Sequence, residues 1–129
     1  MTNFHKFTGI MTLLLLPMLA LVGCQSERQV SFAQDVQPII QKHCIDCHVS
    51  GGRGFEASGF AMNSYEGLMK GTRNGPMIIA GDSEGSNMLV LMEGRADPSI
   101  SMPHGKMEGA TGKEIDTIRL WIDQGAKNN

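Results

Sequence analysis

Residues 44–48 of the chain read Cys44-Ile45-Asp46-Cys47-His48. Two cysteines three positions apart, followed directly by a histidine, form the attachment motif of a c-type haem. One irregular helical turn separates the two thiols by about the distance between the vinyl groups of a porphyrin, so that each thiol can form a thioether. The neutral imidazole of His48 can then bind the iron as the proximal ligand. The motif therefore predicts one covalent haem c.

Three other kinds of site use a Cys-x-x-Cys pair, and the surrounding sequence disfavours each. A redox-active dithiol normally lies where a helix begins, because the helix dipole stabilises its thiolate, whereas this pair ends an apolar-periodic segment. A zinc site needs four ligands, and beyond the motif the mature chain offers His43 and His104 as usual nitrogen donors. A disulfide would close a very small ring and leave His48 without a role. His43 is expected to be a surface or hydrogen-bonding histidine.

The N-terminal segment has the pattern of a secretory signal peptide. Lys6 gives a positive start, and residues 10–22 are almost wholly apolar, but this run is too short for a comfortable membrane span. Leu21-Val22-Gly23-Cys24 resembles a lipobox, the processing site of bacterial lipoproteins. We therefore expect residues 1–23 to be a lipoprotein signal peptide, Cys24 to carry a lipid, and residues 24–30 to be a tether. The alternatives are an ordinary signal peptide that leaves an odd cysteine, and an uncleaved anchor.

This interpretation places the protein in the cell envelope of a Gram-negative-type bacterium, lipid-anchored on the periplasmic side. Gln25, rather than an aspartate, follows the expected lipidated cysteine, which favours the outer membrane. Export also moves the cysteines out of the reducing cytosol, into a compartment where thioether formation and lipidation are both chemically sensible.

Net charge and composition restrict the possible functions further. Residues 1–23 hold one lysine and no acidic residue, so the remaining 106 of the 129 residues carry a formal net charge of −3. This mildly acidic balance argues against a nucleic-acid partner, which a basic patch would favour. One tryptophan, one tyrosine and 16 glycines in the whole chain provide modest means for a hydrophobic core. A covalently held porphyrin would add a large apolar body for the chain to wrap.

Hydrophobic periodicity and capping residues predict helices on both sides of the motif. Residues 31–34, Ser-Phe-Ala-Gln, match a capping box, and the apolar residues of 32–40 share one helical face. Pro38 allows either a short first turn followed by a bend, or a helix that begins near the proline. Residues 49–60 are glycine-rich and predict a loop. Three further helices are expected, capped by Asn63 or Ser64, by Ser86 and by Thr111, and ending near Gly71, Gly94 and Gly125.

An iron bound by His48 has one further axial position, and methionine is the usual ligand in electron transfer. The mature chain offers Met62, Met69, Met77, Met88, Met92, Met102 and Met107. Most lie in apolar or helical runs, where core packing accounts for them. Met102 lies instead in a polar, glycine-flanked loop, and Pro103 would stiffen the backbone beside it. We expect Met102 to be the distal ligand, with His104 and Met107 as the next candidates and an open iron face as the remaining alternative.

The order of helix, Cys-x-x-Cys-His, loops, Met-Pro and a last helix with an aromatic residue resembles that of a class I c-type cytochrome. The closer resemblance is to planctomycete-type monohaem cytochrome c domains, over about residues 30–127. The stretches that carry it are residues 35–40, 44–48 and 64–68, Gly75-Pro76, Gly81-Asp82, Met102-Pro103, Leu120-Trp121-Ile122 and Gly125-Ala126. The chain departs from the pattern at His104, which stands where a second proline is common.

The resemblance implies an all-α fold, a small class I cytochrome c fold in which the first and last helices cross and glycine-rich loops surround one covalent haem. It implies a single monohaem domain over residues 31–127, with Trp121 packed against the face of Val36 and Ile40. The residues it implies for binding the porphyrin and its iron are Cys44, Cys47, His48 and Met102.

A haem with histidine and methionine ligands leaves no open site for a substrate and passes single electrons. We therefore expect a periplasm-facing, membrane-tethered electron carrier. No Ser/His/Asp set or carboxylate pair stands out, so no enzymatic activity is expected of this chain itself. The expected partners are redox proteins and, through the lipid at Cys24, the membrane, with no nucleic acid. The alternatives are a haem-based sensor or ligand-binding module with a displaceable sixth ligand, and an electron-delivering subunit of a larger oxidoreductase.

Overall fold

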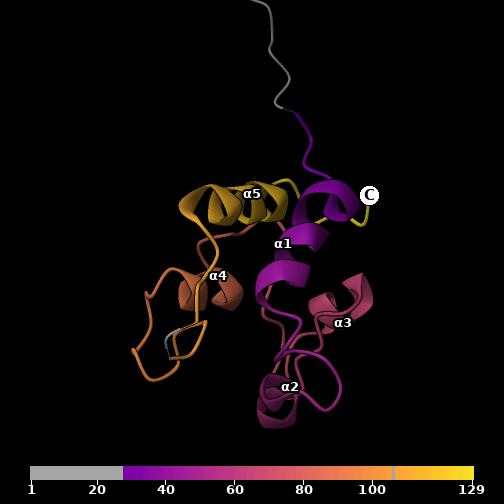
Figure 1. Cartoon of the computed structure of the whole chain (residues 1–129). Coiled ribbons are helices and arrows are strands. Elements are labelled where there is room, and N and C mark those ends of the chain that lie inside the picture. The colour runs from indigo at the N-terminus through magenta and orange to yellow at the C-terminus, as the bar shows by residue number, and fades with distance from the viewer. Residues whose placement is uncertain (1–27, 106) are drawn as a thin grey trace, which may run out of the picture.

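The computed structural model describes residues 28–105 and 107–129, and these residues form helices and loops without a β-strand (Figure 1). The elements in chain order are the π-helical turn η1 (Phe32–Val36), α1 (Gln37–His43), α2 (Arg53–Ser58), α3 (Tyr65–Lys70), α4 (Asn87–Met92) and α5 (Gly112–Asp123). The predicted all-α class is confirmed, and the helices expected after Ser64, Ser86 and Thr111 are present as α3, α4 and α5.

The first helical segment combines the two outcomes that Pro38 allows. The Ser31 side chain accepts a hydrogen bond from the Gln34 N–H and caps η1, and α1 then begins with Pro38 in its first turn. A proline is tolerated there because the N–H groups of a first turn have no intrahelical partner. The return bond of the predicted capping box comes from the Asp35 carboxylate, which accepts from the Ser31 N–H at 2.8 Å.

Helix α5 packs on η1 in one hydrophobic core (Figure 1). Trp121 is 1% exposed, lies in the same buried cluster as Val36 and Ile40, and has its ring centroid 5.6 Å from that of Phe32. Its indole N–H donates to the Lys127 carbonyl at 2.9 Å, so the buried donor is satisfied. Truncation of such a side chain to alanine costs about 3–5 kcal/mol. The terminal helices therefore meet around Trp121, as the resemblance implies.

Asn129 fixes the C-terminal end of the described chain to the start of η1. Its backbone carbonyl accepts from the Ala33 N–H at 3.0 Å, and its side-chain oxygen accepts from the Phe32 N–H at 2.9 Å. Both N–H groups belong to a helix start, where no intrahelical acceptor exists. Val30 joins the same assembly, since it is 4% exposed and its N–H donates to Gln124 Oε1 at 2.7 Å.

The prediction of an uninterrupted loop over residues 49–60 is wrong, because α2 forms within it. Gly51 (φ 84°) turns the chain before the helix, and Gly59 (φ 75°) ends it in the left-handed region. The first turn of α2 is fastened to the Cys-x-x-Cys-His turn, since the Phe55 N–H donates to the Cys47 carbonyl at 2.9 Å. The glycines that favour a loop in the sequence thus allow tight turns and close contact, and tertiary bonds hold this short helix.

Charged side chains join α4, α5 and the start of the loop between them. Arg119 of α5 pairs with Glu84 and Glu93, and Arg95 pairs with the same two carboxylates. Each partly exposed pair contributes at most about 1 kcal/mol. Together they hold Arg95, where the long loop to α5 begins, against both helices.

The capping box predicted at the start of α5 is present. The Thr111 hydroxyl accepts from the Glu114 N–H, and the Glu114 carboxylate accepts from the Thr111 N–H at 2.7 Å. The same carboxylate also reaches α1, where it contacts Lys42 Nζ at 3.2 Å and His43 Nε2 at 3.1 Å. These bonds, those from Thr111 most strongly, lower the pKa of Glu114 to about 2. Glu114 therefore links the N-terminal end of α5 to the C-terminal end of α1.

The variant Glu114→Gln tests this link. Because folding lowers the pKa of Glu114, its carboxylate stabilises the folded state above its ordinary pKa of 4.5, and this contribution is lost as the pH falls toward 2. We expect the thermal unfolding midpoint of the wild type to fall over that window and that of the variant to fall less. Asp116→Asn, which removes an exposed acid from the same helix, should keep the wild-type decline. Parallel curves for Glu114→Gln and the wild type would contradict the link.

Candidate functional site

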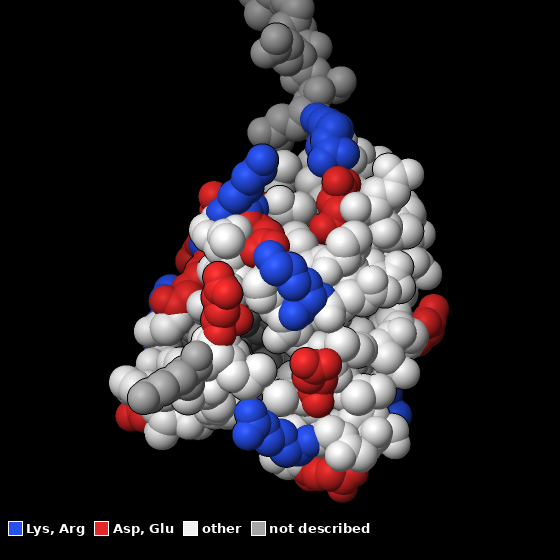
Figure 2. Space-filling model, in the orientation of Figure 1, with Lys and Arg blue, Asp and Glu red and all other residues white. Residues whose placement is uncertain are grey.

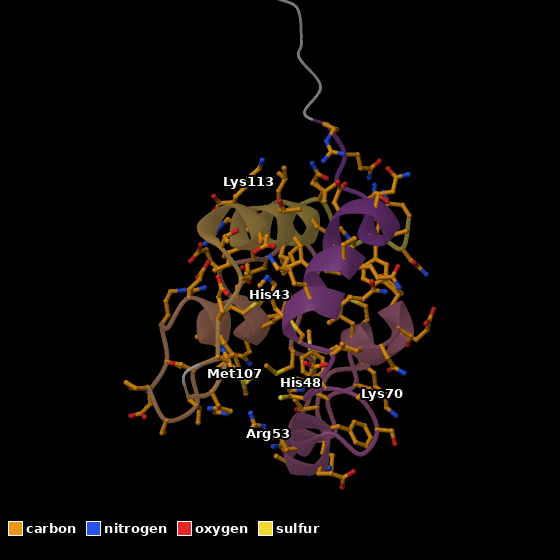
Figure 3. All side chains as sticks on the ribbon, in the orientation of Figure 1. His43, His48, Arg53, Lys70, Met107 and Lys113 are labelled. Atoms are coloured by element: carbon orange, nitrogen blue, oxygen red, sulfur yellow. The ribbon has the colours of Figure 1, made fainter. Side chains whose placement is uncertain are left out.

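A cavity of about 730 Å³ lies between the α1–α2 part of the domain and the segment from α4 to α5. Its walls come from the end of α1, from α2, from residues on both sides of α3, from α4, and from the loop before α5. Cys44, Cys47 and His48 all line it, and Figure 3 shows His48, Arg53 and Met107 on the segments around it. Pockets that bind cofactor-sized ligands have volumes of roughly 300–1,000 Å³, so the cavity is large enough for a prosthetic group.

The Cys-x-x-Cys-His motif forms one irregular turn directly after α1, as predicted. The Cys44 N–H continues the helical pattern by donating to the Ile40 carbonyl at 2.9 Å. The Cys44 carbonyl then accepts from the N–H groups of Cys47 at 3.2 Å and His48 at 3.0 Å. Both cysteines are free thiols, and both are half-buried at the cavity wall. The backbone therefore brings the two sulfurs and the imidazole to one cavity.

The environment of the thiols does not suit a redox-active dithiol. Burial, and secondarily the neighbouring Cys47, raise the pKa of the Cys44 thiol to about 11, whereas redox dithiols depend on a lowered pKa. Cys44 also stands at the C-terminal end of α1, where the helix dipole opposes a thiolate. Within residues 28–105 and 107–129, no three His, Cys, Asp or Glu side chains gather as a metal site. The dithiol and zinc alternatives therefore find no support in the described residues.

The imidazole of His48 is held in one tautomer. Its Nδ1 lies 3.1 Å from the Phe60 carbonyl oxygen, and since a carbonyl can only accept, the proton is assigned to Nδ1 and the lone pair to Nε2. The Phe60 ring meets the imidazole at 67°, with centroids 5.4 Å apart. Burial lowers the pKa of His48, the bond to Phe60 opposes this, and nearby His104 lowers it further. A neutral imidazole with a free Nε2 is the form that binds iron.

The sequence does not predict that the Phe60 carbonyl accepts a hydrogen bond from His48. The side chain of Phe60 is 4% exposed, and its carbonyl acts on His48 as a backbone group that every residue possesses. No residue type signals such an acceptor. The segment that follows Phe60 is fixed to the motif as well, because the Met62 N–H donates to the His48 carbonyl at 2.7 Å.

His43 is a hydrogen-bonded histidine, as expected, although it is not at the surface. Its side chain is 8% exposed, its Nε2 lies 3.1 Å from Glu114 Oε2, and it lines the cavity beside Cys44. This hydrogen bond to Glu114 occupies Nε2 of His43 and forms part of the contact between α1 and α5.

Methionines are abundant on the cavity wall; those that line it are Met62, Met77, Met88, Met92, Met102 and Met107. Met102 is half-buried, and its N–H donates to the Leu91 carbonyl at 3.1 Å, which fixes the loop to α4. Met107 is 41% exposed, and its sulfur accepts from Arg53 Nη2 at 3.3 Å. His104 lines the cavity but is exposed. All three candidate distal ligands therefore lie on one loop at the cavity, and Met102 is the least exposed of them.

Residues 44–105 match the profile of the family described as Planctomycete cytochrome C. The matched span begins at the first cysteine of the motif and ends in the loop that carries Met102. The chain carries a planctomycete-type cytochrome c domain. The resemblance drawn from the sequence is thereby confirmed over residues 44–105. Searches among curated proteins and among solved structures gave no match.

Cytochrome c domains are haem-based electron-transfer domains that bind haem c covalently, and the residues of this cavity fit that group. Two free thiols line a mostly apolar cavity together with a neutral imidazole whose Nε2 is left available. Thioether sulfurs, the soft ligands that complete many such sites, line the same cavity. The residues that line the cavity therefore fit a covalent haem c.

The expected signal peptide over residues 1–23 and the expected lipidation site, Cys24, lie outside the described residues. In the part of the chain that the structure describes, no helix has the length and apolarity needed to cross a bilayer.

Proposed function

We propose that this protein is a periplasm-facing carrier of single electrons with one covalent haem c. Cys44 and Cys47 would hold the porphyrin, and His48 and Met102 would bind its iron. The observation that supports this most strongly is that both thiols and His48 line one cavity of about 730 Å³. The bound haem supplies a one-electron couple between ferric and ferrous iron. No enzymatic activity is proposed for the chain itself.

The residues around the cavity have separate tasks in this proposal. The Phe60 carbonyl holds the proton of His48 on Nδ1, which leaves Nε2 as the ligand atom, and burial lowers the pKa of the ring and so favours its neutral form. The apolar wall, to which Met88 and Leu91 of α4 contribute, keeps water from the group. A water-excluding wall and a thioether ligand both disfavour the more charged ferric state, and so raise the reduction potential.

Among the candidate distal ligands, the contacts favour Met102. The sulfur of Met107 is engaged by the guanidinium of Arg53, and its side chain is 41% exposed. His104 is exposed as well. Met102 is half-buried at the cavity, on a backbone tied to Leu91 of α4. A ligand needs a defined position, which this tie provides.

Replacement of Met102 by alanine tests the ligand assignment. The wild-type ferric protein is expected to show the long-wavelength absorption band of a methionine–iron bond and to bind carbon monoxide slowly when reduced. Met102→Ala should lose the band, bind carbon monoxide rapidly, and have a reduction potential lower by on the order of 0.1 V, within the span of about 0.8 V that axial ligands cover.

Met107→Ala is the matched control, because it removes a methionine from the same loop. It should keep the band and the potential of the wild type. Loss of the band in Met107→Ala but not in Met102→Ala would move the ligand to Met107. Rapid carbon monoxide binding by the wild type would instead favour the sensor function.

We also propose that a lipid at Cys24 anchors the domain to a membrane, with the outer membrane favoured, and that the cavity faces away from the lipid. The first described residue, Arg28, is fixed to the domain: its guanidinium pairs with Asp35 at 3.0 Å, and its carbonyl accepts from Gln124 at 3.2 Å. Figure 3 shows the first described residues at this end of the domain, while His48, Arg53 and Met107 lie toward the other.

The covalent path from Cys24 to Arg28 limits how the domain can turn. Four residue steps span at most about 14 Å, whereas a domain of this size measures roughly 30 Å or more across. A tether this short keeps the end with Arg28 near the bilayer and favours an orientation in which the end with Arg53 points away from it. A redox partner that approaches from the aqueous side fits this orientation better than one buried in the membrane.

A chain exported by a cleavable, non-lipoprotein signal peptide and beginning at Gln25 tests the anchor. The wild type should sediment with membranes and carry a lipid on Cys24 by mass spectrometry, whereas the altered chain should be soluble with the same absorption spectrum. In vesicles, the lipidated protein should be reduced by a water-soluble donor as fast as the soluble form. A wild-type protein without lipid, or one protected from the water-soluble donor by its anchor, would contradict the proposal.

One face of the described domain carries charges of both signs (Figure 2). On the face shown in Figure 2, Lys and Arg side chains are interspersed with Asp and Glu, without a continuous basic stripe. Together with the acidic balance of the mature chain, this supports protein partners.

A further inference from the structure

Helix α2 lies directly against the proximal histidine. A Cβ atom placed on Gly54 would be 2.8 Å from His48 Cε1, 3.0 Å from His48 Nε2 and 2.9 Å from the Cys47 carbonyl oxygen. Real Cβ atoms essentially never approach this closely. Gly54 lies within α2, and its φ is not in the left-handed region, so glycine is required here for space and not for an unusual backbone conformation.

The helix cannot simply move away to admit a side chain. At its start, the Phe55 N–H donates to the Cys47 carbonyl at 2.9 Å. At its end, the Arg73 guanidinium donates to the carbonyls of Glu56 at 2.9 Å and Ala57 at 2.8 Å. The first bond holds the start of α2 against the motif, and the bonds from Arg73 fix its other end to the segment after α3.

The imidazole is also restrained from a second direction. Its Nδ1–H donates to the Phe60 carbonyl at 3.1 Å, and the edge-to-face contact with the Phe60 ring limits rotation about the Cβ–Cγ bond. Gly54 packs on the Cε1–Nε2 edge of the same ring. The ring plane of His48 is therefore set jointly by α2 and by Phe60.

We propose that Gly54 is a positioning residue: the missing side chain lets α2 fix the orientation of the His48 ring about its bond to the iron. Groups that contact a ligand orient it and tune the metal. An alanine at position 54 would force the ring to turn against the Phe60 restraint, and would also press on the Cys47 carbonyl in the turn that carries His48. This inference rests on the proposed function, because it requires His48 to bind the iron.

The test compares Gly54→Ala with Gly112→Ala in the haem-loaded protein. Gly112 stands in the first turn of α5, where an added Cβ meets nothing within 4 Å. We expect Gly54→Ala to shift the largest g-value of the ferric electron paramagnetic resonance spectrum, the spread of the haem methyl proton shifts, and the reduction potential, at unchanged haem content. Gly112→Ala should keep all three, because the ring of His48 is untouched.

If haem-loaded Gly54→Ala has wild-type spectra and potential, this inference is wrong, while the proposed function is unaffected. If Gly54→Ala does not fold, Phe60→Leu replaces it, because that variant keeps the backbone acceptor and removes the ring contact. Phe60→Leu should shift the same spectral features, and its failure to do so would overturn the inference. A wild-type protein without haem would overturn the proposed function, and this inference with it.

Discussion

A mostly apolar cavity of about 730 Å³ is a large space for a domain of roughly 100 residues to enclose, and the rest of the fold is arranged around it. Protein interiors are otherwise packed as densely as organic crystals, and an apolar cavity of this size with a few polar groups is the usual form of a ligand site. The wall carries two thiols, a neutral imidazole and several thioethers. These are the kinds of group that attach haem c and bind its iron, so the cavity and its donors fit the cofactor that the family implies.

The hydrophobic core lies at one end of the domain and the cavity at the other. At one end, η1 and α5 bury Trp121, Phe32 and Val36, and Asn129 closes the start of η1. At the other, short helices and loops surround the cavity and are held by local bonds, such as that of Phe55 to Cys47. The helical core thus supplies a fixed base on which the motif turn and the loop of Met102 are positioned.

Much of this arrangement could be predicted because it depends on residue types at fixed spacing. The Cys-x-x-Cys-His turn, the cap at Ser64 and the capping box of Thr111 and Glu114 are all read from side chains that act within a few positions of one another. The packing of Trp121 with the N-terminal helix followed from the family resemblance and is present.

The features that could not be predicted depend on backbone groups and on contacts between residues distant in the sequence, and neither produces a recognisable sequence pattern. Helix α2 forms where glycines favour a loop, because Gly52 and Gly54 allow it to lie close to the motif. The acceptor for His48 is the carbonyl of Phe60, and the partner of the η1 start is Asn129, nearly 100 residues away. The proposed distal ligand could be predicted only in part. The sequence singles out Met102, and the contacts of the structure favour it over Met107.

The most direct measurement is the mass of the intact protein, produced in a host that matures c-type cytochromes and denatured before analysis. The account predicts that one haem stays attached after denaturation, that the attachment maps to Cys44 and Cys47, and that neither position reacts as a free thiol. A colourless protein in which both cysteines titrate as free thiols would contradict it.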